Sequence, residues 1–235
     1  MTSVPSFKQY PFDGHDELCL SLGRNHTKRV LIVPPLFDEM NRMRRILVDV
    51  MRNLESHKIS SFLMDLPGTN ESRLQLEDMD VSRWQQAVSV CSEQMKTKHI
   101  ASVRGGALAL PPSDEISHWM LAPVKGSALL RTMMRSRVAG DKEAGKETTI
   151  AGLATEAESQ AIELAGNIIS PGMYQSLAEA KPISRSNQRI VRLKNDSKEA
   201  DSRIEGSAIW LRAEPDSDPV LSSAMAQNIA DWVRQ

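Results

Sequence analysis

The residues of this sequence that could do chemistry are concentrated in one stretch, residues 102–106, which we call the elbow. The apolar run before it predicts a strand, and Gly105 and Gly106 predict a sharp turn into a helix. Many enzymes present a nucleophilic serine on such a turn, in the pattern G-x-S-x-G. Here the serine position holds Arg104, and a guanidinium cannot act as a serine-like nucleophile. The elbow therefore presents a cation, although such a turn also fits an ordinary strand-to-helix connection.

Alternating strand and helix patterns lead up to the elbow and predict a parallel sheet. This order places the elbow at the carboxyl end of a strand, where open α/β sheets hold their sites. Each predicted helix has one apolar face at three- and four-residue spacing. We expect a half-solvated edge strand at Glu17–Leu22, further strands at Arg29–Val33, Ile59–Asp65 and His99–Val103, and helices that begin at an Asp38 cap and at Asp80.

The second half of the chain is expected to complete the sheet and to cover it. Pro111 and Pro112 should cut the helix after the elbow short, and residues 125–182 are typical of an insertion laid over the strand ends, as a lid would be. The expected elements are strands at Ser117–Ala122, Ala161–Ser170, Arg189–Leu193 and Ser207–Arg212, helices at Ser127–Val138 and Pro171–Glu179, a polar loop at Gly140–Thr149, and a closing helix from Asp218.

Composition narrows the class of protein. The 235 residues are 40% hydrophobic and 25% charged with a net charge of −1, which suits one soluble α/β domain over residues 1–235 and gives no general attraction to nucleic acid. No basic segment followed by an apolar run opens the sequence, and no apolar stretch is long enough to span a membrane. Cys19 and Cys91 fit two buried thiols in a reducing cytoplasm, and the five histidines show no metal-ligand spacing. We expect a cytoplasmic protein without metal or cofactor.

Three motifs carry a resemblance to a known family. Pro34-Pro-Leu-Phe-Asp-Glu-Met-Asn-Arg-Met-Arg-Arg45 resembles the Pro-Pro-Phe-x-Glu-Glu-Met-Asn-x-x-Arg-Arg signature of the exosortase A system-associated hydrolase 2 proteins. Asp65-Leu-Pro-Gly-Thr-Asn-Glu-Ser72 is similar to that family's Asp-x-x-Gly-x-Gly-x-Ser turn, with Asn70 where glycine is usual. The elbow resembles the family's Gly-Leu-Arg-x-Gly-Ala, which also has arginine at the nucleophile position.

The resemblance implies a fold and a biological setting. It implies an α/β-hydrolase-like domain, with a mostly parallel doubly wound sheet, helices on both faces and a small lid. It also implies an association with exosortase and exopolysaccharide production in Gram-negative bacteria. Partners implied by that setting are an anionic small molecule, a saccharide or lipid intermediate, or another protein of exopolysaccharide production.

The catalytic triad of the α/β-hydrolase fold follows the order Ser, Asp or Glu, then His. Arg104 holds the first position, the acid is expected near Asp196, and the histidine is expected near Glu214. No histidine follows His118 in the sequence. Since two of three members are absent, we expect no serine mechanism, and whether any enzyme activity remains is left open.

Two roles for Arg104 remain open at this stage. A buried guanidinium needs a partner, so Arg104 could form an internal ion pair with Glu39, Glu214 or Asp196. Alternatively it could bind a phosphate or carboxylate together with the Gly105 and Gly106 amides. In both cases we expect side chains of the loop after the Arg29–Val33 strand to lie near Arg104: Glu39, Asn41 and Arg44.

Three functions compete. The first is a non-catalytic binding or accessory protein with Arg104 in a charged cluster. The second is a hydrolase of esters or similar small substrates, with water activated by Glu39 or Glu214 and an oxyanion held by Arg104. The third is an interaction protein that docks a partner through the helix at Leu129–Val138, unless that helix only packs the lid.

Overall fold

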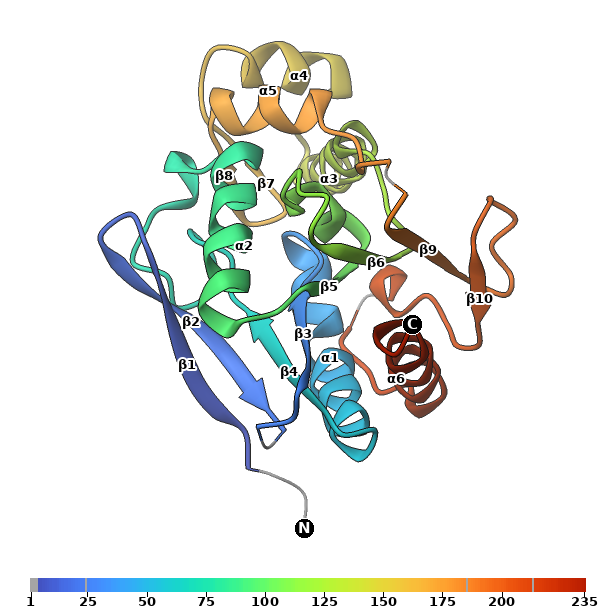
Figure 1. The fold of residues 1–235 in the computed structure, drawn as a ribbon. Helices are drawn as coiled ribbons and strands as arrows, with labels where there is room; N and C mark the ends of the chain where they lie inside the picture. The colour runs from blue at the N-terminus through green and yellow to red at the C-terminus, as the bar shows by residue number, and fades with distance from the viewer. Residues whose placement is uncertain (1–3, 24, 185, 213) are drawn as a thin grey trace.

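An eight-stranded sheet forms the centre of the molecule (Figure 1). The computed structural model describes residues 4–23, 25–184, 186–212 and 214–235. The strand order is β1-β2-β4-β3-β5-β6-β9-β10, in which β2 runs opposite to the other seven strands. The strands are β1 (Ser6–Phe12), β2 (His15–Leu22), β3 (Lys28–Val33), β4 (Ile59–Met64), β5 (His99–Val103), β6 (Ser117–Leu121), β9 (Gln188–Leu193) and β10 (Ser202–Ile204).

Helices cover both faces of this sheet because its central strands are apolar on both sides. In β3, Val30 and Ile32 pack against α1 (Asp38–Ser56) and α6 (Pro219–Val233). Leu31 and Val33 point to the other face, toward α2 (Val81–Met95). The fold is therefore a doubly wound, mostly parallel α/β sheet, as the sequence predicts.

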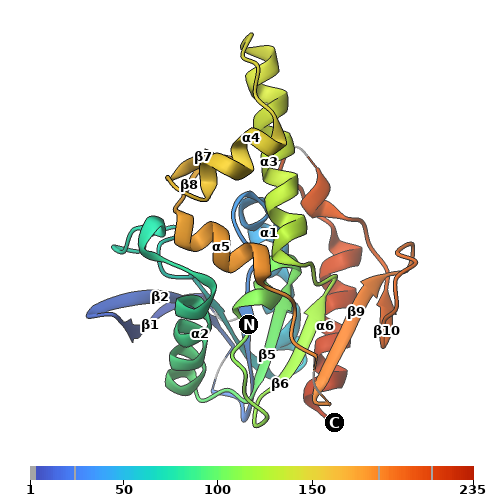
Figure 2. The same cartoon turned by 90° about the horizontal axis from the view of Figure 1, so that it is seen from above.

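Residues 125–182 form a separate group of elements between β6 and β9. They comprise α3 (Gly126–Glu143), α4 (Ile150–Ala157), the hairpin β7 (Ile162–Leu164) and β8 (Asn167–Ile169), and α5 (Pro171–Glu179). Figure 2 shows this group projecting beyond the sheet, and its helix α5 contacts α2. The apolar side of α3 is buried through Leu129, Leu130, Met133 and Met134, so this helix packs within the molecule.

The structure corrects several sequence predictions for the first half of the chain. The edge of the sheet is β1, which the sequence pattern did not reveal, and β2 lies between β1 and β4. Asp38 does not cap α1: Phe37 precedes the helix, and the Asp38 carboxylate pairs with Arg42 one turn later. Asp80 does cap α2, since its side chain accepts a hydrogen bond from the backbone amide of Arg83.

Further corrections concern the second half. α3 continues to Glu143, through part of the predicted polar loop at 140–149, and α4 was not foreseen. The single strand predicted at 161–170 is the β7–β8 hairpin, because Gly166 turns the chain with a φ of 74°. The strand predicted at 207–212 is the 3₁₀ helix η3 (Ile209–Leu211), and the last strand is instead β10.

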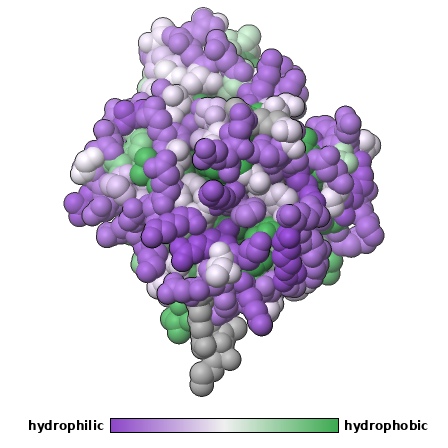
Figure 3. All heavy atoms as spheres, viewed as in Figure 1, coloured by the Kyte–Doolittle hydropathy of each residue, from purple (hydrophilic) through white to green (hydrophobic). Residues whose placement is uncertain are grey.

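Figure 3 shows one face that is largely hydrophilic with scattered hydrophobic patches. Within the described ranges, no helix combines the length and the hydrophobicity that a membrane crossing requires.

Candidate functional site

The elbow has the geometry of a nucleophile turn. β5 ends at Val103 in extended backbone, and Arg104 follows with a φ of 54°, in the left-handed region that non-glycine residues rarely adopt. The chain then enters η2 (Arg104–Ala109), a 3₁₀ helix of six residues that ends before Pro111 and Pro112. Arg104 therefore stands at a strand-to-helix vertex at the carboxyl end of β5.

Gly106 makes the close approach of the elbow to the loop after β3 possible. A Cβ atom added at Gly106 would lie 2.2 Å from the carbonyl oxygen of Pro34. At Gly105 an added Cβ would lie 3.2 Å from side-chain atoms of Leu36 and Leu129. The glycine pair thus holds the elbow against the β3–α1 loop, which brings the first turn of α1 next to Arg104.

Arg104 forms a two-point ion pair with Glu39 in that first turn. Its Nε donates to Glu39 Oε2 at 3.2 Å, and its Nη2 donates to Glu39 Oε1 at 3.0 Å. The side chains are 18% and 7% exposed, so water screens this pair only in part. Of the three carboxylates that the sequence offered to Arg104, the structure selects Glu39.

Trp210 in η3 completes the surroundings of the guanidinium. The Arg104 Cζ lies 5.1 Å from the centre of the Trp210 ring, within the range of a cation–π contact. Arg42 holds η3 against α1 by donating to the Trp210 carbonyl oxygen at 3.0 Å. The Arg104 Nη1 also reaches the Ala122 carbonyl oxygen after β6, at 3.4 Å. The cluster of Arg104, Glu39 and Trp210 is called the elbow cluster below.

Trp210 was missed as a site residue because the sequence pattern placed it in a strand. The last strand, β10, ends at Ile204. The position at which the catalytic triad would carry its histidine, just after the last strand, therefore lies in the segment before η3 and not near Glu214. Glu214 itself is exposed. The only signal for it in the sequence is that residues 210–214 also resemble the exosortase A system-associated hydrolase 2 proteins.

The other predicted site residues lie apart from the ion pair. Asp196 follows β9, as expected for the acid position, but it pairs with Arg192 at 3.0 Å. Asn41 is exposed on α1. Arg44 pairs with Asp65 after β4, at 2.5 Å between Nη1 and Oδ1. Of the predicted ligand-binding residues, the structure thus places Glu39 and Gly105 next to Arg104. Arg44 instead pairs with Asp65, and Asn41 is exposed on α1.

Ser102, Ser72 and His118, the described residues nearest in role to the missing pair, do not replace it at the elbow. Ser102 is buried and lies 3.4 Å from the Trp119 carbonyl oxygen, and Ser72 donates to Glu17. His118 is buried on β6 in register with Ile100. Four residues separate Ile100 from Arg104, which corresponds to about 13 Å along a strand.

A second polar cluster surrounds the Arg44–Asp65 pair, where β2 begins and β4 ends. The Asp65 carboxylate also accepts from Asn70 at 2.6 Å. Glu17 on β2 is 1% exposed and accepts from Ser72 at 2.8 Å, while its Oε2 has no hydrogen-bond partner in the described structure. Burial raises the pKa of Glu17, the Ser72 hydrogen bond and nearby His15 oppose this rise, and Asp65 adds to it.

The described residues contain no group of three metal-binding side chains. Cys19 and Cys91 are free and buried, as predicted. The hydrogen bond with the Cys91 thiol is the main cause that raises the pKa of Cys19, and burial is the second. The Cys19 thiol is therefore a poor nucleophile.

Comparisons with known proteins identify the fold. The alpha/beta hydrolase GrgF from Penicillium sp. sh18 aligns with a TM-score of 0.63 at 16% identity, over 99% of this chain and 98% of that one. DcsB, solved with its substrate analogue, aligns with a TM-score of 0.61 at 10% identity, over 98% of both chains. Est1E from Butyrivibrio proteoclasticus, solved with ferulic acid, gives 0.59 at 13% identity over 79% of this chain and 77% of that one.

These identities are too low to transfer an activity, and they show the fold alone. No protein-family model matches the chain, and the comparison with curated proteins finds no match either. The chain has the α/β-hydrolase fold, with arginine at the position where that fold carries its nucleophile.

Proposed function

Starting from an α/β-hydrolase fold, we propose that this protein is a non-catalytic binding or accessory protein. The observation that carries the proposal is the elbow cluster: Arg104 occupies the vertex and is neutralised by Glu39. A guanidinium held in this way neither attacks a carbonyl nor accepts a proton. The elbow cluster therefore serves recognition and stability in place of bond cleavage.

The charge balance of the elbow cluster favours one of the ligand classes expected from the sequence. Arg104 and Glu39 together carry no net charge, and η2 is too short to add a substantial helix dipole. A phosphate or carboxylate would have to compete with Glu39 for the guanidinium. A neutral hydroxyl can instead use the N–H groups that Arg104 leaves over. The ligand is thus a saccharide or lipid intermediate that presents hydroxyl groups.

The biological setting rests on the sequence motifs. The Pro34–Arg45 stretch and the elbow resemble exosortase A system-associated hydrolase 2 proteins, which supports a role in exopolysaccharide production, together with a protein partner of that system. The free buried cysteines support a cytoplasmic location. Deleting the gene in its host and measuring secreted exopolysaccharide tests this setting, and unchanged secretion contradicts it.

The competing function is a hydrolase that uses Glu39 to activate water. Both carboxylate oxygens of Glu39 accept hydrogen bonds from Arg104, so a water molecule would have to compete with the guanidinium for this carboxylate. Glu214, the other candidate base, is exposed. The geometry favours the binding function.

Turnover of p-nitrophenyl acetate by the wild type and by Glu39→Gln separates the two functions. We expect no turnover above that of the heat-denatured protein in either sample. Turnover that the wild type has and Glu39→Gln lacks would establish the hydrolase. Calorimetric titration with short oligosaccharides then tests binding. We expect Arg104→Met to lose oligosaccharide binding. Arg52 is an exposed arginine of α1, and Arg52→Met, the control, should retain binding.

A further inference from the structure

The sheet face under α2 changes from apolar to polar toward the amino ends of the parallel strands. Side chains two residues apart on a strand share a face. On β2, buried Cys19 is followed on this face by Ser21, and on β3, Leu31 is preceded by Arg29. The register places Arg29 beside Ser60 of β4. Polar groups therefore lie together on a face that is otherwise a hydrophobic core.

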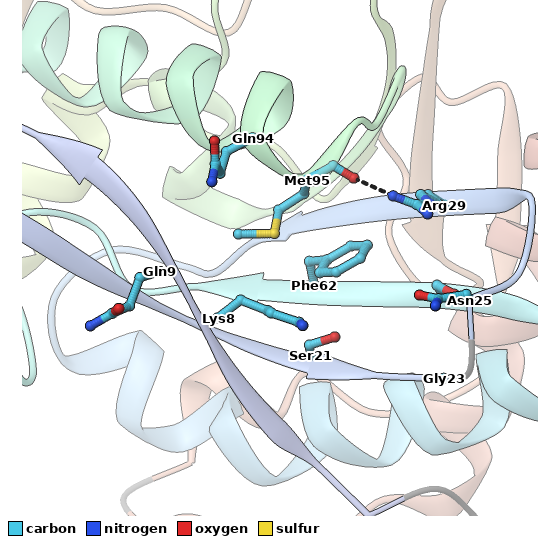
Figure 4. Close-up of a pocket in the computed structure, with 10 residues that line it drawn as sticks. Lys8, Gln9, Ser21, Gly23, Asn25, Arg29, Phe62, Gln94 and Met95 are labelled. Atoms are coloured by element: carbon cyan, nitrogen blue, oxygen red, sulfur yellow. Dashed lines mark hydrogen bonds between the residues drawn. The ribbon is translucent and has the colours of Figure 1, made fainter.

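This polar corner is hollow because α2 ends there. The helix stops at Met95, and a cavity of about 210 Å³ lies between its last turn and the strands. Figure 4 shows the side chains of Lys8 and Arg29 reaching toward this space from β1 and β3, with the Phe62 ring between them. We call this cavity the corner pocket.

The corner pocket is positively charged. Lys8 and Arg29 line it, and none of the described residues that line it carries a carboxylate. The Lys8 ammonium has neither an ion pair nor a hydrogen bond with any residue in the described ranges. Arg29 donates to the Met95 carbonyl oxygen at 3.1 Å through Nη1. Two cations without a counter-charge in a half-enclosed site attract an anion.

The hydroxyl of Ser21 can serve the same kind of ligand. Ser21 is only 7% exposed and lines the corner pocket. Its hydroxyl forms no hydrogen bond with the described part of the chain. The hydroxyl is not among the fully buried groups that lack a partner, so it is accessible from the pocket and can donate a hydrogen bond to a bound oxyanion.

We propose that the corner pocket binds a small phosphate monoester. Two cations match the charge of about −1.5 to −2 that a phosphate monoester carries at neutral pH. Phe62 and Met95 give the ester's organic part an apolar contact. The cavity is smaller than the roughly 300–1,000 Å³ of sites for drug-sized ligands, which limits the ligand to one small group. That group is either a free metabolite or the headgroup of a lipid.

This site is separate from the elbow cluster. It lies at the amino ends of β3 and β4, whereas Arg104 follows the carboxyl end of β5. The result of testing it therefore has no bearing on whether the elbow cluster binds or hydrolyses a ligand.

Calorimetric titration of the full chain with glucose 1-phosphate, inorganic phosphate and glucose tests the proposal. We expect both phosphates to bind with an affinity that depends on Lys8, and we expect Lys8→Gln to have no effect on any binding of glucose. Lys8→Gln should weaken phosphate binding roughly tenfold or more, because a hydrogen bond to a charged group is lost. Ser21→Ala should weaken it severalfold, and Lys142→Gln, the same change at an exposed lysine of α3, should leave it unchanged. Urea unfolding of each variant verifies folding.

Co-sedimentation with phosphatidylcholine vesicles that contain phosphatidic acid identifies the source of the phosphate. Vesicle binding that Lys8→Gln abolishes, without binding of the soluble phosphates, supports the site and assigns it to a lipid headgroup. Absence of saturable binding to all phosphate probes overturns the proposal. Equal affinity of the wild type and Lys8→Gln also overturns it.

Discussion

Removing either member of the Arg104–Glu39 pair should destabilise the fold, because the side chain that remains loses its ion-pair partner. Arg104→Met keeps most of the aliphatic volume and leaves the 7%-exposed Glu39 carboxylate unpaired. Breaking a buried ion pair costs about 3–5 kcal/mol. Since Arg104 is 18% exposed, we expect a value at the lower end, about 3 kcal/mol, or a fall in Tm of roughly 6–12 °C.

Glu39→Gln should cost less, about 2 kcal/mol, because the guanidinium can still contact Trp210 and water. The double variant Arg104→Met/Glu39→Gln should be more stable than the sum of the single changes predicts, by about 2 kcal/mol. Urea unfolding of the four proteins measures this coupling energy.

The exposed Asp49–Arg52 pair on the same helix, 31% and 54% exposed, provides the matched control. Asp49→Asn and Arg52→Met should couple by only about 0.3–0.5 kcal/mol. If the Arg104 and Glu39 changes add within about 0.5 kcal/mol, the pair does not hold the elbow together, and the reasoning on the elbow cluster fails.

Three further predictions concern packing, pH and capping. Gly106→Ala should lower the free energy of unfolding, measured in urea, by about 3 kcal/mol or more, because the new Cβ would lie 2.2 Å from a backbone carbonyl oxygen. The control Gly140→Ala in α3 has open space around it and should stabilise the protein by about 0.5–1 kcal/mol. Burial raises the pKa of Glu17 above its ordinary 4.5, so its contribution to stability is present below that value and is lost as the pH rises through the folded-state pKa. Glu17→Gln should therefore gain stability relative to the wild type as the pH rises above 4.5. Asp218→Ala should cost about 1–2 kcal/mol, because the Asp218 side chain caps α6 through the Leu221 amide at 2.8 Å.

Each of these has an outcome that contradicts it. Equal stability of Gly106→Ala and Gly140→Ala would mean that the elbow does not depend on the close approach. A stability difference between the wild type and Glu17→Gln that does not change with pH would contradict the raised pKa. Burial alone would raise the pKa of Asp218, but the hydrogen bonds from Ser207 and from backbone amides lower it. The cost of Asp218→Ala should therefore shrink below about pH 3.8, and a constant cost would refute this.

The central part of the fold could be predicted because its sequence patterns reflect burial. β3 ends in a continuous apolar run, β5 is mainly apolar, and helices bury both faces of the sheet at these strands. α1 repeats its apolar residues at helical spacing. β1 and β10 lie at the two edges of the sheet. There one side of a strand lacks a neighbour and polar residues are tolerated, so the pattern weakens.

The candidate site was predictable only in part for a different reason. The position of Arg104 follows from local sequence, because the glycines and the preceding strand lie beside it. The partner of Arg104 does not, since Glu39 is 65 positions away and two other carboxylates were equally compatible with the sequence. Trp210 was hidden because a short apolar run, here Ile209–Leu211, fits a strand as well as a 3₁₀ turn.

The neighbouring strands β5 and β6 are both followed by a non-glycine residue in left-handed backbone, Arg104 with a φ of 54° and Ala122 with a φ of 46°. Such conformations persist only where the surrounding structure fixes them. A ligand approaching this edge of the sheet therefore meets a preorganised surface, and its association need not spend entropy on ordering a loop. The unliganded protein is accordingly a suitable template for docking and for fragment screening.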